Sequence, residues 1–160
     1  MEARLIALKL LLDELRVPAE INSVDDRKLI QKAVYLGQLT GVDLGYRFSW
    51  YLMGPYSPAL TRDYYSLAEA IASDDPGAEG KQLHPDVRDR LQRVAGLLTS
   101  LAFNLGQEDW LELVASVHFL RRVSRYSHER AEAVLREKKP HLAPHMELAE
   151  EALQRAGLLQ

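Results

Sequence analysis

Apolar side chains recur at helical spacing at the start of the chain. Four leucines that lie three or four residues apart predict an amphipathic helix over residues 2–16, which Pro18 ends. These are Leu5, Leu8, Leu12 and Leu15. Ser23 and Asp26 then have the spacing of a capping box, which predicts a second helix over residues 24–40. Its predicted buried stripe consists of Leu29, Ala33, Leu36 and Thr40.

At residues 46–52 the helical spacing gives way to a strict two-residue alternation of side chains, which predicts a β-strand. One face of that strand would carry Tyr46, Phe48, Trp50 and Leu52. Gly54 and Pro55 are predicted to end the strand, because proline has no N–H group for a ladder. Ser57 followed by Pro58 then predicts the N-cap and the first residue of a third helix, which ends near residue 73.

A single strand needs a partner for its backbone hydrogen bonds. Residues 42–44 and residues 18–21 are two segments of the chain that could supply one. Pairing with the same strand of a second copy, in a homodimer, is a further alternative. The sequence leaves the choice among these three open.

Residues 73–85 contain two glycines, two prolines and several charges, which predicts a linker. Helical spacing predicts four helices beyond it, over residues 86–105, 108–122 and 127–138 and from residue 144 to residue 156. We therefore predict a mainly α protein with a small β element. A helical N-terminal lobe would span residues 1–72, alternatively with a winged-helix-like arrangement, and a helical C-terminal lobe over residues 86–160 would pack against it.

Composition and charge narrow the classes of function. With 47% hydrophobic and 27% charged residues the chain should be globular, and a formal charge of 20 − 23 = −3 gives no overall attraction to nucleic acid or an anionic membrane. The absence of cysteine excludes disulfides, thiolate nucleophiles and cysteine-ligated metals. Lys9 and Asp13 interrupt the apolar N-terminus, which lacks signal-peptide organisation. We predict a cytoplasmic protein with no membrane partner, no cofactor and no metal.

Aromatic residues are concentrated around the predicted strand and the Gly54-Pro55 turn. Eight of the twelve aromatic residues lie between positions 35 and 65, and they cannot all be internal. Tyrosine and tryptophan are favoured at protein interfaces, so the surplus predicts a partner surface beside the turn. The predicted partner-binding residues are Lys28, Lys32, Tyr35, Tyr51, Gly54, Pro55, Tyr56 and Ser57.

Two groups of basic residues suggest contacts with anionic partners. Lys28 and Lys32 lie four residues apart on the second helix, where they could contact phosphates or an acidic protein. Seven basic and three acidic residues between positions 119 and 140 give a local charge of 7 − 3 = +4, although helix dipoles alone also favour cations there. The predicted basic patch is Arg121, Arg122, Arg125, Lys138 and Lys139.

No catalytic constellation is evident. Arg122 and His128 have a spacing similar to that of the arginine–histidine pair of HEPN-type ribonucleases, but a predicted helix cap at Ser127 separates them. His141 and His145 have the spacing of a helical metal pair, interrupted by Pro144 and without a nearby third ligand. We therefore predict no catalytic and no metal-binding residues.

Three stretches together resemble a prokaryotic family. Residues 27–36 (RKLIQKAVYL) resemble the lysine–tyrosine helix of YwgA-like proteins, and residues 50–58 (WYLMGPYSP) resemble their Gly-Pro turn. Residues 110–120, followed by the Lys-Lys-Pro of residues 138–140, resemble the C-terminal helix and K-P segment of the same family. The N-terminal half is more distantly similar to the Panacea domain, a mainly helical module of antitoxins and phage-associated proteins. The resemblance implies an antitoxin-like or defence-associated role.

Together these features favour a non-catalytic protein-interaction module, an antitoxin-like or defence-associated regulator. Its partner, a toxin or another defence component, would bind residues 51–58 and the Lys28/Lys32 helix face. The alternative is a nucleic-acid-binding regulator of winged-helix type, in which Lys28, Lys32, Arg47 and Arg62 contact phosphates. A ribonuclease that uses Arg122 and His128 ranks third.

Overall fold

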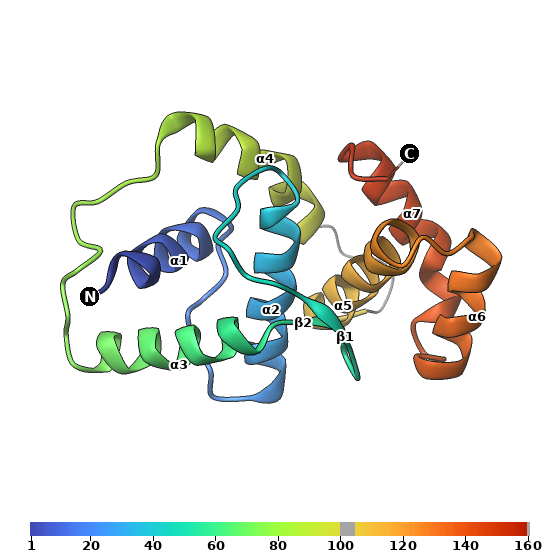
Figure 1. Cartoon of the computed structure of the whole chain (residues 1–160), viewed down its shortest axis with the longest axis horizontal. Coiled ribbons are helices and arrows are strands. Elements are labelled where there is room, and N and C mark those ends of the chain that lie inside the picture. The colour runs from blue at the N-terminus through green and yellow to red at the C-terminus, as the bar shows by residue number, and fades with distance from the viewer. Residues whose placement is uncertain (100–104, 160) are drawn as a thin grey trace.

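The computed structural model describes residues 1–99 and 105–159 (Figure 1). Within these residues it contains seven α-helices and one two-stranded antiparallel sheet, so the predicted mainly α fold with a small β element is confirmed. The elements in chain order are α1 (Ala3–Glu14), α2 (Val24–Gln38), β1 (Ser49–Tyr51), β2 (Gly54–Tyr56), α3 (Pro58–Ala72), α4 (Pro85–Thr99), α5 (Gln107–His118), a π-helical turn (Phe119–Val123), α6 (His128–Lys138), a 3₁₀ turn (Ala143–His145) and α7 (Met146–Arg155).

The predicted helix starts are confirmed by their caps. Ser23 accepts the Asp26 N–H at 3.0 Å, and the Asp26 carboxylate accepts the Ser23 N–H, which completes the capping box of α2. Ser57 accepts the Leu60 N–H at the start of α3, where Pro58 occupies the first turn. Ser127 caps α6 in the same way.

The β element differs from the prediction. The strand is Ser49–Tyr51, and it pairs in an antiparallel hairpin with Gly54–Tyr56, so that Trp50 lies opposite Pro55. The segment that was predicted to end the strand is therefore its partner within the chain, and the partners predicted at residues 42–44 and at residues 18–21 were wrong. A proline can occupy an outer strand when its missing N–H is not required by the ladder.

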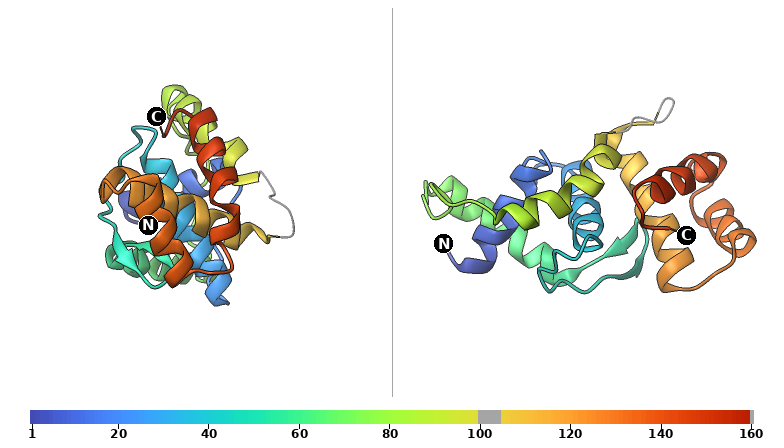
Figure 2. Two further views of the ribbon diagram at one scale, coloured as in Figure 1. Left: turned by 90° about the vertical axis from the view of Figure 1, so that its right-hand side faces the viewer. Right: turned by 90° about the horizontal axis from the view of Figure 1, so that it is seen from above.

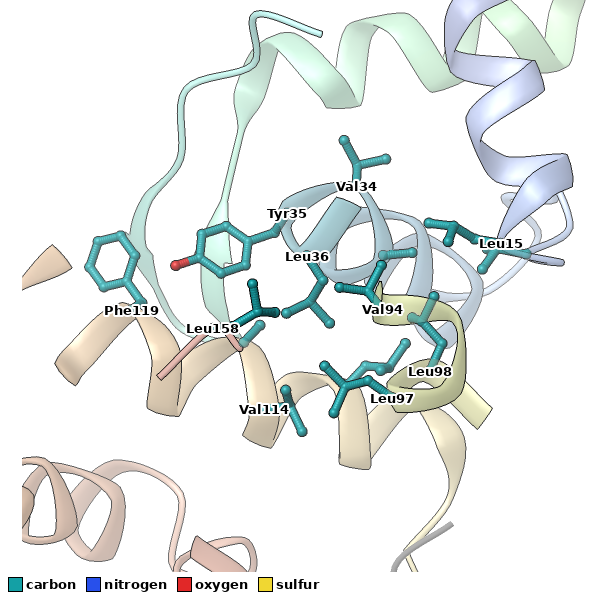
Figure 3. Packing of buried hydrophobic residues seen from close by; sticks show 14 of the residues in the cluster. Leu15, Val34, Tyr35, Leu36, Val94, Leu97, Leu98, Val114, Phe119 and Leu158 are labelled. Carbon is teal, nitrogen blue, oxygen red and sulfur yellow. The ribbon is translucent and has the colours of Figure 1, made fainter. Parts of the chain in front are cut away.

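α2 is the central element of the fold (Figure 1). It packs against α1, α4 and α5, and the hairpin covers one of its sides. Figure 3 shows Leu36 of α2, Leu98 of α4 and Val114 of α5 among the buried side chains between these helices. These side chains belong to a single hydrophobic core to which both predicted lobes contribute. α5 runs from α2 towards α6 and α7, which form the end of the molecule away from the N-terminus (Figures 1 and 2).

The predicted C-terminal helices differ from the observed ones mainly at their ends. α4 is described as far as Thr99, and residues 100–104 of the helix predicted to residue 105 lie outside the described part of the chain, whereas residue 105 is not helical. The helix predicted over residues 108–122 consists of α5 and the π-helical turn that follows it. Pro144 lies in a 3₁₀ turn directly before α7. None of the described helices is long and apolar enough to cross a membrane.

Candidate functional site

α2 carries a row of long polar side chains that contact internal partners instead of solvent. They recur at spacings of three or four residues, which places them along one side of the helix. The row consists of Lys28, Gln31, Lys32, Tyr35 and Gln38. Each of them bonds to the hairpin, to the loop before it, to the Ser57 turn after it or to α5. The row therefore attaches the region around the hairpin to the helical core.

Two amides in this row hold the ends of the segment that contains the hairpin. Gln38 accepts the N–H groups of Leu44 and Tyr46 at 3.1 Å each and donates to the Tyr46 carbonyl. Gln31 accepts the Ser57 N–H at 2.9 Å and donates to the Ser57 carbonyl at 3.0 Å. Side-chain amides can satisfy a donor and an acceptor at once, so each glutamine replaces a missing strand neighbour.

Three lysines converge on one buried carboxylate, and we call Lys28, Lys32, Lys139 and Glu112 the lysine cluster. The two oxygens of Glu112 accept from different lysines, Lys28 at 2.8 Å and Lys139 at 2.7 Å. Lys28 also contacts Asp109 at 3.3 Å. Lys32 has no carboxylate within ion-pair distance among the described residues and donates to the Pro55 carbonyl at 2.6 Å. α2, α5 and the C-terminal end of α6 thus meet beneath the hairpin.

Burial and pairing shift the pKa values of this cluster in opposite directions. Burial is the largest single influence and opposes the charged forms of Lys28 and Glu112, but the hydrogen bonds and charges of their partners together outweigh it. The pKa of Lys28 is therefore raised by Glu112 and Asp109, and that of Glu112 is lowered by Lys139 and Lys28. Burial lowers the pKa of Lys32 to about 7, because the attraction of Glu112 is opposed by the repulsion of Lys139 and Lys28. Lys32 therefore titrates near neutral pH, whereas the pKa shifts of Lys28 and Glu112 favour their charged forms.

The lysine cluster also fixes the hairpin. Lys139 donates to the Leu52 carbonyl at 2.6 Å, on the chain that turns from β1 to β2, and its ammonium lies 5.6 Å from the ring centre of Trp50. Lys32 holds β2 through the Pro55 carbonyl. Both bonds come from side chains with only 2% exposure, so water competes little for them.

Gly54 lets the hairpin approach α5 closely. Its φ of +91° belongs to the left-handed region that favours glycine, and a Cβ there would lie 2.5 Å from the Ser116 Oγ. That hydroxyl is buried and has no hydrogen-bond partner among the described residues. The turn at Gly54 therefore packs tightly on α5 over a hydroxyl group without a partner.

The tip of the hairpin is apolar and open. Tyr51, Leu52 and Met53 are 58%, 81% and 43% exposed. They line a pocket of about 270 Å³ together with residues of α2 and α3, including Lys28 and Lys32. Five of the seven large exposed hydrophobic residues in the described part of the chain line this pocket. We call these five the apolar rim: Val24, Tyr51, Leu52, Met53 and Tyr65.

The structure divides the predicted partner-binding residues. Tyr51 is exposed and Tyr56 is partly buried, so both can be reached from outside. Most of the other predicted residues are buried in the free protein. These are Lys32, Tyr35, Gly54, Pro55 and Ser57, and the Lys28 side chain is only 9% exposed. They hold the hairpin in place, because their polar groups bond inside the protein. Lys28 and Lys32 do not form the open basic face that was predicted for phosphate contacts.

The predicted basic patch is also divided. Arg122, Arg125 and Lys138 are exposed. Lys139 belongs to the lysine cluster, so its assignment to a surface patch was wrong, and Arg121 donates to Glu150 at 2.5 Å. Most cations of this segment therefore lie at the surface, whereas Lys139 is internal.

Two histidines, His128 and His118, lie in different environments. His128 bonds to Glu150 through Nδ1, and this hydrogen bond raises its pKa. Tyr35 shares a 2.7 Å hydrogen bond with His118 Nδ1, and burial lowers the pKa of His118 to about 4, which keeps its ring neutral. No group of three or more potential metal ligands occurs among the described residues.

Sequence reasoning missed Glu112, Val24 and Tyr65, and it included Leu52 and Met53 only as part of the predicted partner-binding segment of residues 51–58. Glu112 lies within the apolar stretch of residues 110–120, and a lone acid in such a stretch signals a buried partner for a cation. Leu52 was assigned to the inner face of the strand, but it lies at the turn and is the most exposed hydrophobic residue of the rim. Val24 and Tyr65 carry no local signal, because α2 and α3 bring them to the rim.

Comparisons with protein-family models, with curated proteins and with solved structures find no match for this chain. The class of this protein is therefore described from its fold and its site alone. It is a mainly α protein in which buried lysines hold a β-hairpin and an apolar rim surrounds a pocket.

Proposed function

We propose that this protein is a non-catalytic protein-interaction module that binds its partner through the apolar rim. The observation that carries the proposal is the gathering of five of the seven large exposed hydrophobic residues around one pocket. Scattered exposed hydrophobic residues are normal on protein surfaces, whereas a contiguous apolar patch around a concavity is typical of a binding site.

The rigidity of the hairpin supports this proposal. Lys139 bonds to the backbone at Leu52, and Lys32 bonds to the backbone at Pro55, one residue past Gly54. A loop held in its bound conformation loses little conformational entropy when a partner docks. Tyr51 also packs on Tyr56 with ring centres 5.3 Å apart, which orients the aromatic wall of the pocket. The surface is thus formed before the partner arrives.

The partner that fits this surface is a protein with an apolar segment that enters the pocket. The Panacea-like pattern of the N-terminal half favours a toxin or another defence component, and we place the protein among antitoxin-like or defence-associated regulators. Nucleic acid is less suited to the rim, because phosphates need exposed cations and the two lysines nearest the pocket are buried.

The test is affinity purification from the native cell with the wild-type protein, Leu52→Asp and Ile71→Asp in parallel. Ile71 is 40% exposed and lies outside the rim, so it provides the matched control. A stoichiometric protein that survives nuclease, is lost with Leu52→Asp and is retained with Ile71→Asp supports the proposal. Equal recovery with both variants contradicts it. Nucleic acid alone, lost after nuclease, would favour the nucleic-acid-binding alternative instead.

A further inference from the structure

We propose that the pocket receives a carboxylate of the protein partner, and that the Lys32 ammonium is the group that binds it. This inference rests on the proposed function, since it names the chemistry of the segment that docks at the apolar rim. The partner segment would carry an acidic group next to an apolar or aromatic side chain.

The distribution of charge in the lysine cluster leaves one cation unmatched. Glu112 uses one oxygen for Lys28 and the other for Lys139, and Asp109 is the second acid, bonded to Lys28. Three ammonium groups against two carboxylates give 3 − 2 = +1. Lys32 is the ammonium without a direct acidic partner among the described residues. One added carboxylate would therefore bring the net charge of these groups to zero.

Lys32 also has unused hydrogen-bonding capacity. An ammonium carries three N–H donors, and the Pro55 carbonyl is the only acceptor that Lys32 reaches among the described residues. Lys32 is one of the residues that line the pocket. A carboxylate that enters there could accept from the free donors without breaking the bond that holds β2. Charge-assisted bonds of this type are strong where water is excluded.

The walls of the pocket select a carboxylate on an apolar carrier. Tyr51, Leu52 and Met53 form one side, and Val24 and Tyr65 lie on α2 and α3. A phosphate dianion would add two negative charges where the excess is one. A nucleic acid would bring a row of phosphates to a pocket whose other cations are already engaged, Lys28 by Glu112 and Arg27 by the Ile21 carbonyl. Charge and apolar character therefore point to an acidic peptide.

Binding should be linked to protonation. Burial and two neighbouring lysines depress the pKa of Lys32, and a bound carboxylate favours its charged form and raises that pKa. The free protein must then take up a proton to bind wherever Lys32 is neutral. Affinity for a carboxylate should therefore increase as the pH falls through about 7. Glu112 and Asp109 on α5, Lys28 on α2 and Lys139 after α6 are the charged groups that surround Lys32.

The experiment uses 3-phenylpropionate as the probe and its uncharged amide, 3-phenylpropionamide, as the matched control. NMR of the full-length protein with ¹³C-labelled lysine follows binding and the titration of Lys32. We expect the carboxylate to bind at least about tenfold more tightly than the amide at pH 6, and about tenfold more tightly at pH 6 than at pH 8. The apparent pKa of Lys32 should rise when the probe is bound.

Variants identify the lysine responsible. Lys32→Met should abolish the preference for the carboxylate, and Lys81→Met, at an exposed position far from the lysine cluster in sequence, should retain it. If Lys32→Met does not fold, the pKa change of Lys32 in the wild-type protein decides the question. Equal binding of probe and amide, an unchanged Lys32 pKa, or tighter binding of inorganic phosphate overturns the inference.

The two proposals can fail separately. Absence of probe binding, combined with loss of the cellular partner in Leu52→Asp, removes the role of Lys32 and leaves the interaction surface in place. Probe binding that depends on Lys32, combined with equal partner recovery by Leu52→Asp and Ile71→Asp, removes the interaction surface and leaves an anion site.

Discussion

Two basic regions of this protein look alike in sequence and differ completely in the structure. The lysine cluster is buried beneath the hairpin, while the segment of residues 119–140 carries most of its cations on the surface. Lys138 and Lys139 show the contrast at adjacent positions. The Lys138 side chain is 61% exposed beside Glu137, and the Lys139 side chain is 2% exposed between Glu112 and Leu52.

This difference shows that the surroundings of a cation determine how much it contributes to the stability of the protein. An exposed ion pair is screened by water and contributes little to stability. A buried ion pair does not necessarily stabilise a protein relative to an apolar core, but removing one partner leaves a desolvated charge and is costly. Mutations in the two regions should therefore have very different effects, and the following experiments test that difference from the largest expected effect to the smallest.

Glu112→Gln should have the largest effect. It removes the carboxylate shared by Lys28 and Lys139 and leaves three buried ammonium groups near Asp109 alone. We expect the free energy of unfolding to fall by about 3–5 kcal/mol in urea denaturation at neutral pH. Glu137→Gln, at an exposed position, is the control and should change it by less than about 0.5 kcal/mol. Similar effects of the two changes would refute the distinction between the regions.

The adjacent lysines provide the closest comparison. Lys139→Met should cost about 2–3 kcal/mol of unfolding free energy, because the Leu52 carbonyl and one oxygen of Glu112 lose their donor. Lys138→Met should stay within about 0.5 kcal/mol. Thermal and urea denaturation of both variants measures this difference. Equal stability of the two proteins would show that Lys139 is not held as described.

Lys32 gives the buried region a pH dependence. Burial holds its pKa in the folded protein at about 7, below the ordinary value of 10.5, so the unfolded chain binds more protons between these values. Stability should therefore rise with pH above about 7, by roughly 2 kcal/mol up to about pH 9. Urea denaturation of the wild-type protein and Lys32→Met across this range checks the effect. If the stability of Lys32→Met rises with pH by the same amount, the pH dependence comes from other titrating groups.

The turn of the hairpin is expected to show the smallest of the four effects. Gly54→Ala forces a side chain into a left-handed conformation and against the Ser116 hydroxyl, which should cost about 1–2 kcal/mol. Ser116→Ala should be neutral or slightly stabilising, because the buried hydroxyl has no partner among the described residues. The double variant should recover about 0.5–1 kcal/mol of the Gly54→Ala cost, measured as the coupling in a double-mutant cycle. If the effects of Gly54→Ala and Ser116→Ala on the free energy of unfolding were strictly additive, this would contradict the close approach of Gly54 to α5.

Helices were the part of the fold that could be predicted well, and their caps explain why. Ser23, Ser57 and Ser127 each bond to an N–H group three positions further along the chain, so the signal and its effect lie within one turn. The hairpin was predicted in part: the alternation over residues 46–52 includes β1 but overestimates its length, and the three residues of β2 are too few to show an alternation of their own. Pro55 also suggested an end to the strand, although it lies within β2 opposite Trp50.

The candidate site was found in part. The concentration of aromatic residues at positions 35–65 correctly drew attention to the hairpin, and Tyr51 is exposed there. The inference that Lys28 and Lys32 form an accessible face was wrong, because a spacing of four residues places two side chains on one side of a helix but does not determine what covers that side. The covering hairpin and α5 come from sequence positions far from α2.

The sequence by itself determined the helical segments, their starts and the small size of the β element, because these follow from local spacing and capping. Only the tertiary structure decided that Lys28, Lys32 and Lys139 meet at Glu112, and that Val24 and Tyr65 join the hairpin tip around one pocket. These contacts join residues up to 84 positions apart. Burial and electrostatics at such contacts depend on the packing of whole elements, and no local pattern in the chain carries that information.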